Sequence, residues 1–337
     1  KYQEALINHI KTNPKFIQPE HRKNEVLGFL KQPLNDLCIS RPKSRLNWGI
    51  ELPFDSDYVT YVWFDALINY ITAPGFMSDD DSFQKWWPAS YHLIGKDILT
   101  THAVYWPTML MSANIELPKS IFAHGWWLME ESKISKSVGN VVDPISLIDD
   151  YGVDPVRYYL MREMVLGQDA NFTIESFIKR YNSDLANDFG NLLSRVSTLM
   201  KKNYDGKIPE SGELTEAELK IKSRGESLGK LVMDMIKKMR INDAIEETMQ
   251  YIRSVNKYME ESAPWKLVKE DKEAAGRVLY TAGEALRISA VLLSPVMPNR
   301  TEVLLEALNA KGENLDWGGL KSGRELKDHK PLFPRVK

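Results

Sequence analysis

Cysteine is almost absent from this 337-residue sequence, in which Cys38 is the only one. A single cysteine excludes an internal disulfide bond and any zinc site built from cysteine ligands within these residues. Cys38 stands in the apolar run Leu37-Cys38-Ile39, so we expect a buried strand residue rather than a reactive thiol. The low cysteine content also fits a reducing, cytoplasmic setting, which we take as the expected localisation.

Long apolar runs and a strong net charge are missing as well. No run approaches the roughly 20 residues that a helix needs to cross a bilayer, so no membrane partner is expected. The 44 Lys and Arg nearly balance 46 Asp and Glu, giving a net charge of −2. The charge is unevenly spread, however: residues 1–177 carry −6 and residues 178–337 carry +4. That is the sign expected if the second half approaches phosphates.

The first half alternates strand-like and helical patterns. Helices are predicted near residues 1–12, 20–31, 65–71 and 98–113, and strands at 37–40, 59–63, 92–95 and 120–123. This alternation favours an α/β fold with an open, mostly parallel sheet. Ligands of such sheets bind beyond the carboxyl ends of the strands. The turn Gly95-Lys96-Asp97 follows one predicted strand directly, although an ordinary strand-to-helix connection would read the same way.

A 3.6-residue periodicity dominates from about residue 178. It predicts helices at 179–203, 215–237, 240–260, 273–293 and 297–309, with an irregular tail that packs back at 331–334. Short connections between such helices favour an antiparallel all-α bundle. We therefore expect three parts, an α/β domain (1–124), a connecting segment with two short helices (125–177) and a helical domain (178–337).

The most informative stretch is residues 131–140 (ESKISKSVGN). Lys133 and Lys136 are flexible point charges suited to following phosphate oxygens, the serines add hydroxyl donors, and Gly139 permits a turn. Taken alone, the stretch would equally suit an ordinary basic surface loop. It resembles the lysine loop of class I aminoacyl-tRNA synthetases, in which ATP activates an amino acid for transfer to tRNA.

Two further segments resemble the methionyl-tRNA synthetase family within that class. Residues 61–70 (YVWFDALINY) resemble the segment that lines the methionine pocket, and residues 92–106 (HLIGKDILTTHAVYW) resemble the next pocket segment, whose start also contacts ATP. The resemblance extends over essentially the whole chain. It implies the second half of a Rossmann-like nucleotide-binding domain, a connecting segment that contacts the tRNA stem, and an anticodon-binding bundle.

The resemblance implies a methionine pocket lined by Trp63, Ala66, Tyr70, Ile98, His102 and Trp106. An aromatic wall with few polar groups suits a flexible, polarisable thioether. The spacing i, i+4, i+8 would place Ile98, His102 and Trp106 on one helix face, for which plain core packing is the alternative. A buried histidine needs a hydrogen-bonding partner, and we expect the substrate or a tyrosine.

The resemblance also implies ATP-binding residues, namely Gly95, Asp97, His124, Trp126, Lys133 and Lys136. Asp97 would bind ribose hydroxyls, although a helix N-cap would explain it as well. Lys133 and Lys136, with Arg41, would be catalytic and stabilise charge on the triphosphate; for Arg41 an ordinary salt bridge is the alternative. Mg²⁺ would accompany ATP, held chiefly by phosphate oxygens, and no metal site, zinc included, is expected in this chain.

In the helical half, Asn191 and Arg195 lie at i, i+4, and Trp265 follows Pro264 at a predicted helix start. They resemble the Asn-x-x-x-Arg pair and the tryptophan with which the family reads the CAU anticodon of tRNA(Met). Base-edge hydrogen bonds and aromatic stacking are the usual means of reading single-stranded bases. Without the resemblance, surface polar residues would be the default interpretation.

One signature of the family is absent, because none of the six histidines forms a His-x-Gly-His motif. We therefore expect the C-terminal portion of a methionyl-tRNA synthetase, partnered by the missing N-terminal half of the catalytic domain and inactive in adenylation by itself. Two alternatives remain at this point. One is another class I synthetase for a hydrophobic amino acid, and the other is a non-catalytic tRNA-binding protein derived from a synthetase.

Overall fold

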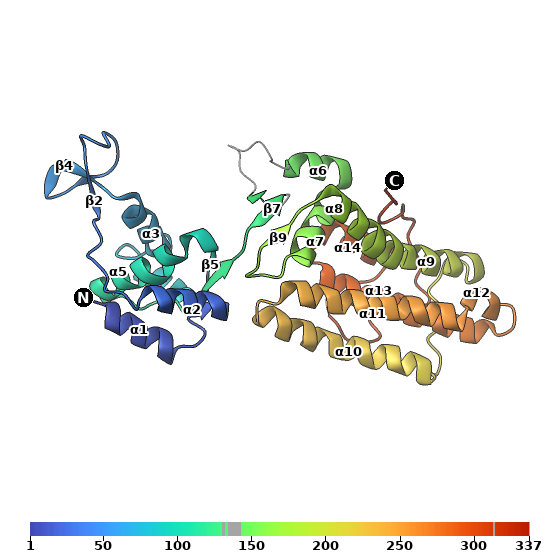
Figure 1. The fold of residues 1–337 in the computed structure, drawn as a ribbon. Helices are drawn as coiled ribbons and strands as arrows, with labels where there is room; N and C mark the ends of the chain where they lie inside the picture. The colour runs from blue at the N-terminus through green and yellow to red at the C-terminus, as the bar shows by residue number, and fades with distance from the viewer. Residues whose placement is uncertain (130–131, 134–142, 313, 337) are drawn as a thin grey trace. The chain divides into compact units, whose positions relative to one another are not determined.

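The computed structural model describes residues 1–129, 132–133, 143–312 and 314–336. They form two compact units, Lys1–Trp126 and Trp127–Lys337, which are described separately below. The first unit combines helices with a parallel sheet and the second is mainly helical (Figure 1). The expected combination of an α/β and an all-α fold is confirmed, whereas the predicted three-part division stays a prediction.

The parallel sheet of the first unit has the strand order β1-β6-β5. β1 (Ile17–Gln18) and β5 (His92–Gly95) flank β6 (Ile121–His124), and both pair with it in parallel. Gly95 and His124 are partners in the register, so the carboxyl ends of β5 and β6 lie side by side. The helices α1 (Gln3–Thr12) and α2 (Glu20–Phe29) contribute to the same buried apolar cluster as β5 and β6. β1 was not predicted, because two residues carry too little pattern.

A second sheet in this unit corrects two strand predictions. β2 (Ser40–Pro42), β4 (Asp55–Thr60) and β3 (Glu51–Leu52) form a small antiparallel sheet, so the segments at 37–40 and 59–63 do not extend the parallel one. Most of β4 is exposed, and only Val59 is buried. Strands of a parallel sheet are buried on both faces, which the aspartates of β4 would not tolerate. Cys38 is likewise exposed, contrary to expectation.

The helices that follow this sheet carry the pocket segments. α3 (Val62–Thr72) begins three residues before the predicted helix, and α4 (Asp80–Trp86) is capped by the Asp79 carboxylate, which accepts the Ser82 N–H. The single helix predicted at 98–113 consists of a 3₁₀ turn η1 (Lys96–Ile98), a π-helical stretch η2 (Thr101–Tyr105) and α5 (Trp106–Ala113). π-Helical stretches are rare in proteins, and many of those that occur lie at functional sites.

The second unit opens with a small sheet of β8 (Ser132–Lys133), β7 (Trp127–Met129) and β9 (Ala170–Asn171). Two helices lie between these strands in sequence, α6 (Pro144–Tyr151) and α7 (Val153–Glu163), as predicted for the connecting segment. The Asp143 carboxylate accepts backbone N–H groups of Ile145 and Ser146, and so caps α6. Proline at the first position of α6 requires no N–H donor there.

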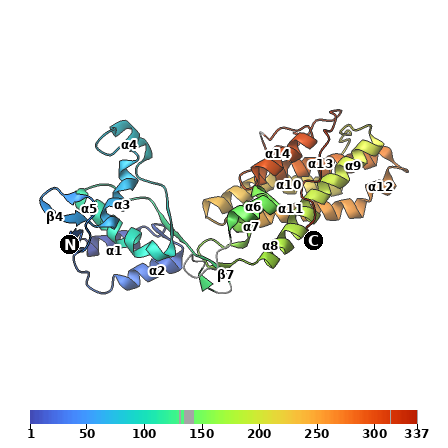
Figure 2. The same cartoon turned by 90° about the horizontal axis from the view of Figure 1, so that it is seen from above.

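The long helices of the bundle match the predicted ranges to within two residues. They are α10 (Glu216–Lys237), α11 (Ile241–Ser262), α13 (Lys272–Leu293) and α14 (Pro298–Ala307), with the short α12 (Pro264–Leu267) between α11 and α13. α10, α11 and α13 pack against one another (Figure 1, Figure 2). Leu332 and Phe333 are buried in the same core, which confirms the predicted return of the tail.

The helix predicted at 179–203 is continuous but not uniform. α8 (Ile174–Arg180) runs into a π-helical stretch η3 (Tyr181–Gly190) and then into α9 (Asn191–Asn203). The 3.6-residue pattern found the helix but could not distinguish the two windings. In the described part of the chain, no helix has both the length and the apolarity that crossing a bilayer requires.

Candidate functional site

A cluster of aromatic rings and two histidines brings together most of the predicted methionine pocket. Tyr70 on α3 and His102 on η2 are hydrogen-bonded through Oη and Nε2 at 3.0 Å. Trp63 on α3 lies edge-on to His102, with ring centroids 6.0 Å apart. Trp106, at the start of α5, donates its indole N–H to Nε2 of His92 on β5 at 3.1 Å. Tyr70 also contacts His92, with a centroid distance of 4.2 Å, so one ring connects both pairs.

The hydrogen bonds determine which nitrogen of each histidine carries the proton. Nδ1 of His102 is 3.0 Å from the carbonyl oxygen of Ile98, which can only accept, so this nitrogen is protonated. In the neutral ring, Nε2 of His102 is then the acceptor, and the Tyr70 hydroxyl donates to it. Nε2 of His92 accepts the Trp106 N–H and must likewise be unprotonated. The ring of His92 is therefore neutral in this arrangement.

Burial explains why neutral rings are favoured. His92, His102 and Trp106 are buried, while Tyr70 keeps 37% of its surface exposed. Burial lowers the pKa of His92 to about 4, and the neighbouring His102 contributes to the shift. Burial also lowers the pKa of His102, although its bond to the Ile98 carbonyl opposes the shift. Burial raises the pKa of Tyr70, which keeps its hydroxyl protonated as a donor. The result is an uncharged, aromatic site.

The predicted nucleotide residues meet at the carboxyl ends of β5 and β6. Gly95 and His124 end these strands as register partners, and the Asp97 carboxylate follows Gly95 by two residues. Trp126 donates its indole N–H to Oδ1 of Asp97 at 3.2 Å. The Lys96 ammonium lies over the same indole, 4.1 Å from the ring centroid. A carboxylate, an indole and a cation thus converge where α/β sheets bind ligands.

The absence of a side chain at Gly95 has a specific reason. A Cβ at this position would lie 2.6 Å from Oδ1 of Asp97, closer than real contacts allow. Glycine thus leaves room for the carboxylate to lie against the end of β5 and to accept from Trp126. The alternative for Asp97 was an N-cap before Ile98, but Gly95 occupies the N-cap position of η1 and Asp97 lies within this turn.

The remaining pocket residues lie at the edge of these clusters. Ile98 packs with the apolar cluster around α1, α2 and the parallel sheet, whereas Trp106 belongs to a second cluster with Leu67 and Leu110. The two side chains thus do not share one uniform helix face, because η1 and the wider π-helical stretch η2 change the angular spacing. Ala66 is partly buried on α3, between Trp63 and Tyr70 in sequence.

Of the three predicted catalytic cations, the structure describes the side chain of Arg41 only. The Arg41 guanidinium lies over the Tyr61 ring, 4.0 Å from its centroid, and donates to the backbone oxygens of Cys38 and Ser40. No carboxylate forms an ion pair with it among the described residues, so the salt-bridge alternative gains no support. Lys133 ends β8, opposite Leu128 of β7, and its backbone alone is described. Lys136 lies outside the described residues.

The predicted anticodon residues gather at one end of the bundle. Arg195 on α9 forms a salt bridge with Glu260 on α11 at 2.7 Å, and its guanidinium lies 5.3 Å from the centroid of the Trp265 ring. α11 ends at Ser262. The next residue, Ala263, has φ 40° in the left-handed region, and Pro264 begins α12 directly afterwards. This sharp turn directs the chain so that Trp265 meets Arg195. Asn191 is exposed one helical turn before Arg195.

Comparison with known proteins agrees with these arrangements. Residues 1–197 match a family described as tRNA synthetases class I (M). Residues 208–328 match the anticodon binding domain of methionyl tRNA ligase. The chain belongs to the methionyl-tRNA synthetase family. Another class I family is thereby excluded.

Members of the family are similar over the whole chain. The methionine–tRNA ligase of Clostridium acetobutylicum is 45% identical over 344 residues, which cover all of this chain and 53% of the relative. That of Rickettsia typhi is 42% identical, and the match covers 68% of it. A structure of Mycobacterium tuberculosis methionyl-tRNA synthetase bound by methionyl-adenylate matches with a TM-score of 0.93 at 39% identity, covering 99% of this chain and 67% of that one. The chain spans about half the length of several curated relatives, including that of Bacillus subtilis.

Sequence reasoning missed His92. It was assigned to a strand, although its ring contacts Tyr70, Trp87 and Trp106. A buried histidine at the start of an apolar strand should have raised the question of its partner. The described residues contain no cluster of three His, Cys, Asp or Glu side chains able to hold a metal ion.

Proposed function

We propose that this chain supplies the methionine- and ATP-binding part of a methionine–tRNA ligase, together with the bundle that recognises tRNA(Met). The activity would convert methionine and ATP to methionyl adenylate and then transfer methionine to tRNA. The observation that carries the proposal is the aromatic network from Tyr70 to Trp106, which includes His92 on β5, the strand that ends at Gly95 next to His124.

The aromatic network suits a methionine side chain. Trp63, Tyr70 and His102 offer polarisable ring faces and edges, and aromatic contacts to sulfur contribute about 0.3–1.5 kcal/mol. Neutral histidines avoid placing a cation against an apolar thioether. A pocket that measured size alone would distinguish one methylene by only about 1–3 kcal/mol, so the sulfur contacts add to selectivity.

The residues at the strand ends suit the nucleotide. Gly95 would let the nucleotide come close to the backbone at the end of β5. The Asp97 carboxylate would accept hydrogen bonds from the ribose hydroxyls, and Trp126 and His124 would border the adenine. Mg²⁺ would accompany ATP and be held by phosphate oxygens, since Mg²⁺ is seldom bound by a cage of protein ligands alone.

The chemical step is largely electrostatic. The methionine carboxylate attacks the α-phosphorus and pyrophosphate leaves, while negative charge develops on the phosphate oxygens. The side chains of Lys133 and Lys136 would stabilise that charge, and Arg41 would assist. Preorganised positive charge is usually the largest catalytic contribution in such reactions.

The bundle would read the anticodon. Trp265 presents an indole for stacking, and Arg195 and Asn191 present donors along one turn of α9. Because Arg195 is paired with the exposed Glu260, RNA would compete for its guanidinium at the rim of the bundle.

A fusion protein tests the proposal. Residues 1–337 are joined to the N-terminal part of the Rickettsia typhi relative, and ATP–pyrophosphate exchange is measured with methionine. We expect exchange by the fusion and none by residues 1–337 alone, because these contain no His-x-Gly-His motif. Asp97→Asn in the fusion should lower the rate, whereas Asp57→Asn, on the exposed strand β4, should not. Normal exchange by residues 1–337 alone would contradict the expected inactivity.

The second candidate is a tRNA-binding protein without catalytic activity, which the half-buried Arg195–Trp265 pair alone would allow. Binding of a CAU anticodon stem–loop is measured in parallel with exchange. A fusion that binds this RNA but does not exchange with methionine would favour the second candidate. Loss of both activities would contradict both proposals.

A further inference from the structure

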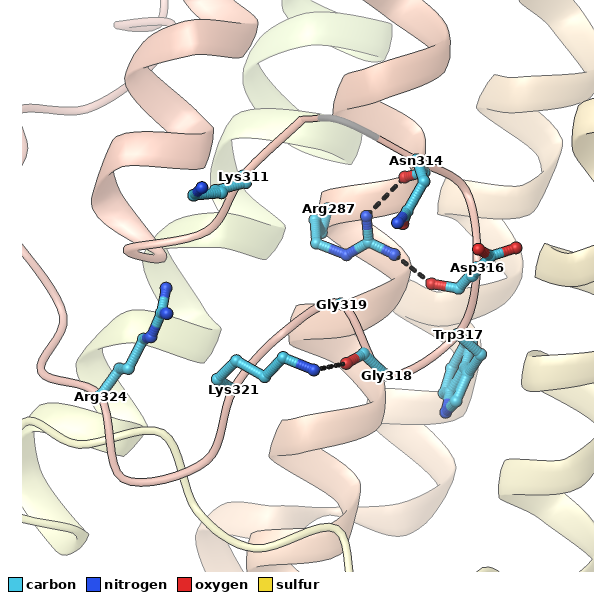
Figure 3. A pocket seen from close by; sticks show the side chains of 9 residues that line it. All are labelled: Arg287, Lys311, Asn314, Asp316, Trp317, Gly318, Gly319, Lys321 and Arg324. Atoms are coloured by element: carbon cyan, nitrogen blue, oxygen red, sulfur yellow. Dashed lines mark hydrogen bonds between the residues drawn. The ribbon is translucent and has the colours of Figure 1, made fainter.

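A basic pocket lies on the helical unit beneath the C-terminal tail. The cavity measures about 310 Å³ and is lined by Arg287 of α13 and by tail residues 311, 314, 316–319, 321 and 324. Its described lining includes the cationic side chains of Arg287, Lys311, Lys321 and Arg324 and the carboxylate of Asp316. Figure 3 shows Asp316 on the opposite side of Arg287 from Lys311 and Arg324, with its carboxylate pointing away from them. Because Glu284 neutralises Arg287, the cations that matter for a ligand are those of Lys321 and Arg324.

A buried ion pair builds the wall of this pocket. Glu284 and Arg287, both on α13, have essentially no exposed surface and are paired at 2.7 Å. Arg287 donates to the backbone oxygens of Asn314 at 2.7 Å and Asp316 at 2.6 Å. The Glu284 carboxylate accepts three consecutive backbone N–H groups, from residues 318–320, at 2.7–2.9 Å. The pair thus fixes both sides of the loop to α13.

The loop lies directly against the guanidinium. A Cβ at Gly319 would be 2.4 Å from Cζ of Arg287, so only glycine permits this approach. With Arg287 already bonded to Glu284 and to two carbonyl oxygens, the loop has little freedom to change its path. The pocket is therefore preformed, which reduces the ordering cost of binding a ligand.

Two of the cations retain unused donors. Among the described residues, the Lys321 ammonium makes one hydrogen bond, to the Gly318 oxygen at 2.9 Å, and the Arg324 guanidinium makes one, to the Asn309 oxygen at 3.2 Å. Within the part of the chain that the structure describes, neither forms a salt bridge with a carboxylate. Both are exposed, and several like charges around one hollow repel one another. An anion would relieve this repulsion and accept the remaining N–H groups.

We propose that this pocket binds a phosphate group. The volume lies at the lower end of the range of about 300–1,000 Å³ typical of ligand sites, which suits one or two phosphates. Arg324 provides a planar fork of donors and Lys321 a compact point charge, and both bind phosphate well. The phosphate comes either from the backbone of a bound RNA or from a free anion such as pyrophosphate.

A matched pair of double variants tests the proposal on the full 337-residue chain. Lys321→Gln with Arg324→Gln removes two charges from the pocket without touching the Glu284–Arg287 pair. Lys237→Gln with Lys238→Gln removes two exposed charges at the end of α10, outside the pocket. Circular dichroism and thermal unfolding establish that both variants keep the fold.

Two titrations distinguish the sources of the phosphate. Inorganic pyrophosphate is titrated by calorimetry, and the pocket variant should bind at least tenfold more weakly than the parent chain and the α10 variant. A transcribed tRNA with a CAU anticodon is titrated at several salt concentrations. If the RNA backbone occupies the pocket, the slope of log K against log salt should fall by about 0.7–0.9 for each lost phosphate contact.

Each outcome decides. Weakened pyrophosphate binding with an unchanged salt slope assigns the pocket to a free anion, and a reduced slope assigns it to RNA. If the two double variants behave alike in both titrations, the effect is one of general charge and the proposal is wrong. The pyrophosphate titration does not depend on the proposed ligase activity, so the two proposals fail separately.

Discussion

Replacing His92 by Gln should remove part of the acid sensitivity of the first unit. His92 has a pKa of about 4 in the folded chain, against an ordinary value near 6.5, because its ring is buried. The neutral ring is therefore favoured by folding. Its stability contribution is fully present above pH 6.5 and is lost as the pH falls toward 4, since the unfolded chain binds the proton first.

The magnitude follows from the pKa difference. A pKa lowered from 6.5 to about 4 corresponds to a loss of about 3.4 kcal/mol in the free energy of unfolding once the pH is below 4. About 2 kcal/mol of this is already lost at pH 5. His102 should add to the effect in the same direction, because its pKa is also lowered. Glutamine at position 92 does not titrate in this range but still offers an oxygen acceptor to the Trp106 N–H.

Native-state hydrogen exchange at pH 7 and pH 5 measures this difference. The amides of β5 and β6 report the opening free energy of the first unit by itself, after correction for the intrinsic exchange rate. Between pH 7 and pH 5, we expect this opening free energy to fall by about 2 kcal/mol more in the parent chain than in the His92→Gln variant. Equal losses in both proteins, or a protonated His92 ring at pH 5 by nuclear magnetic resonance, would refute the reasoning.

Three further substitutions test the site and the bundle. Tyr70→Phe removes the donor to the buried Nε2 of His102 and should cost about 1–3 kcal/mol, measured by the same exchange experiment. Trp265→Ala should weaken binding of a CAU stem–loop by about 5- to 150-fold, the equivalent of one stacked base, measured by fluorescence anisotropy. Glu284→Ala leaves the Arg287 guanidinium buried without its partner and should cost about 3–5 kcal/mol, measured by denaturant unfolding of the helices.

Each of these substitutions has a control of the same chemistry. Tyr58→Phe removes a hydroxyl from β4, outside the aromatic network, and should leave exchange in β5 unchanged. Trp86→Ala removes an exposed indole from α4 and should not affect RNA binding. Glu216→Ala removes an exposed carboxylate from α10 and should leave the unfolding midpoint in place. A control that changes as much as its test variant would count against the corresponding argument.

Much of the architecture followed from local sequence pattern. The ranges of α10, α11, α13 and α14 were predicted to within two residues. α10 and α11 bury apolar residues at helical spacing, whereas α13 is buried on nearly all sides. The pattern failed where partners decide the structure. The strand predicted at 59–63 for the parallel sheet overlaps β4 only at Val59 and Thr60, and the aspartates of β4 fit only a strand with exposed faces.

The candidate site was predicted unevenly. The meeting of Gly95 with His124 follows from parallel pairing, since both residues end strands of one sheet. The pairing of Arg195 with Trp265 does not, because 70 residues and the left-handed turn at Ala263 separate them. The resemblance to the synthetase family named both residues without giving their contact. Their roles in RNA binding stay a prediction.

The sequence by itself determined the helices, the strand ends and the residue types available for chemistry, because periodicity and turn formation depend on neighbours along the chain. Only the tertiary structure decided that His92 is neutral and that Glu284 and Arg287 hold the tail against α13. Both depend on burial, and burial is set by side chains that arrive from distant segments. The sequence thus gives the type of each residue, whereas the side chains packed around it in the folded chain determine its protonation state and its hydrogen-bond partners.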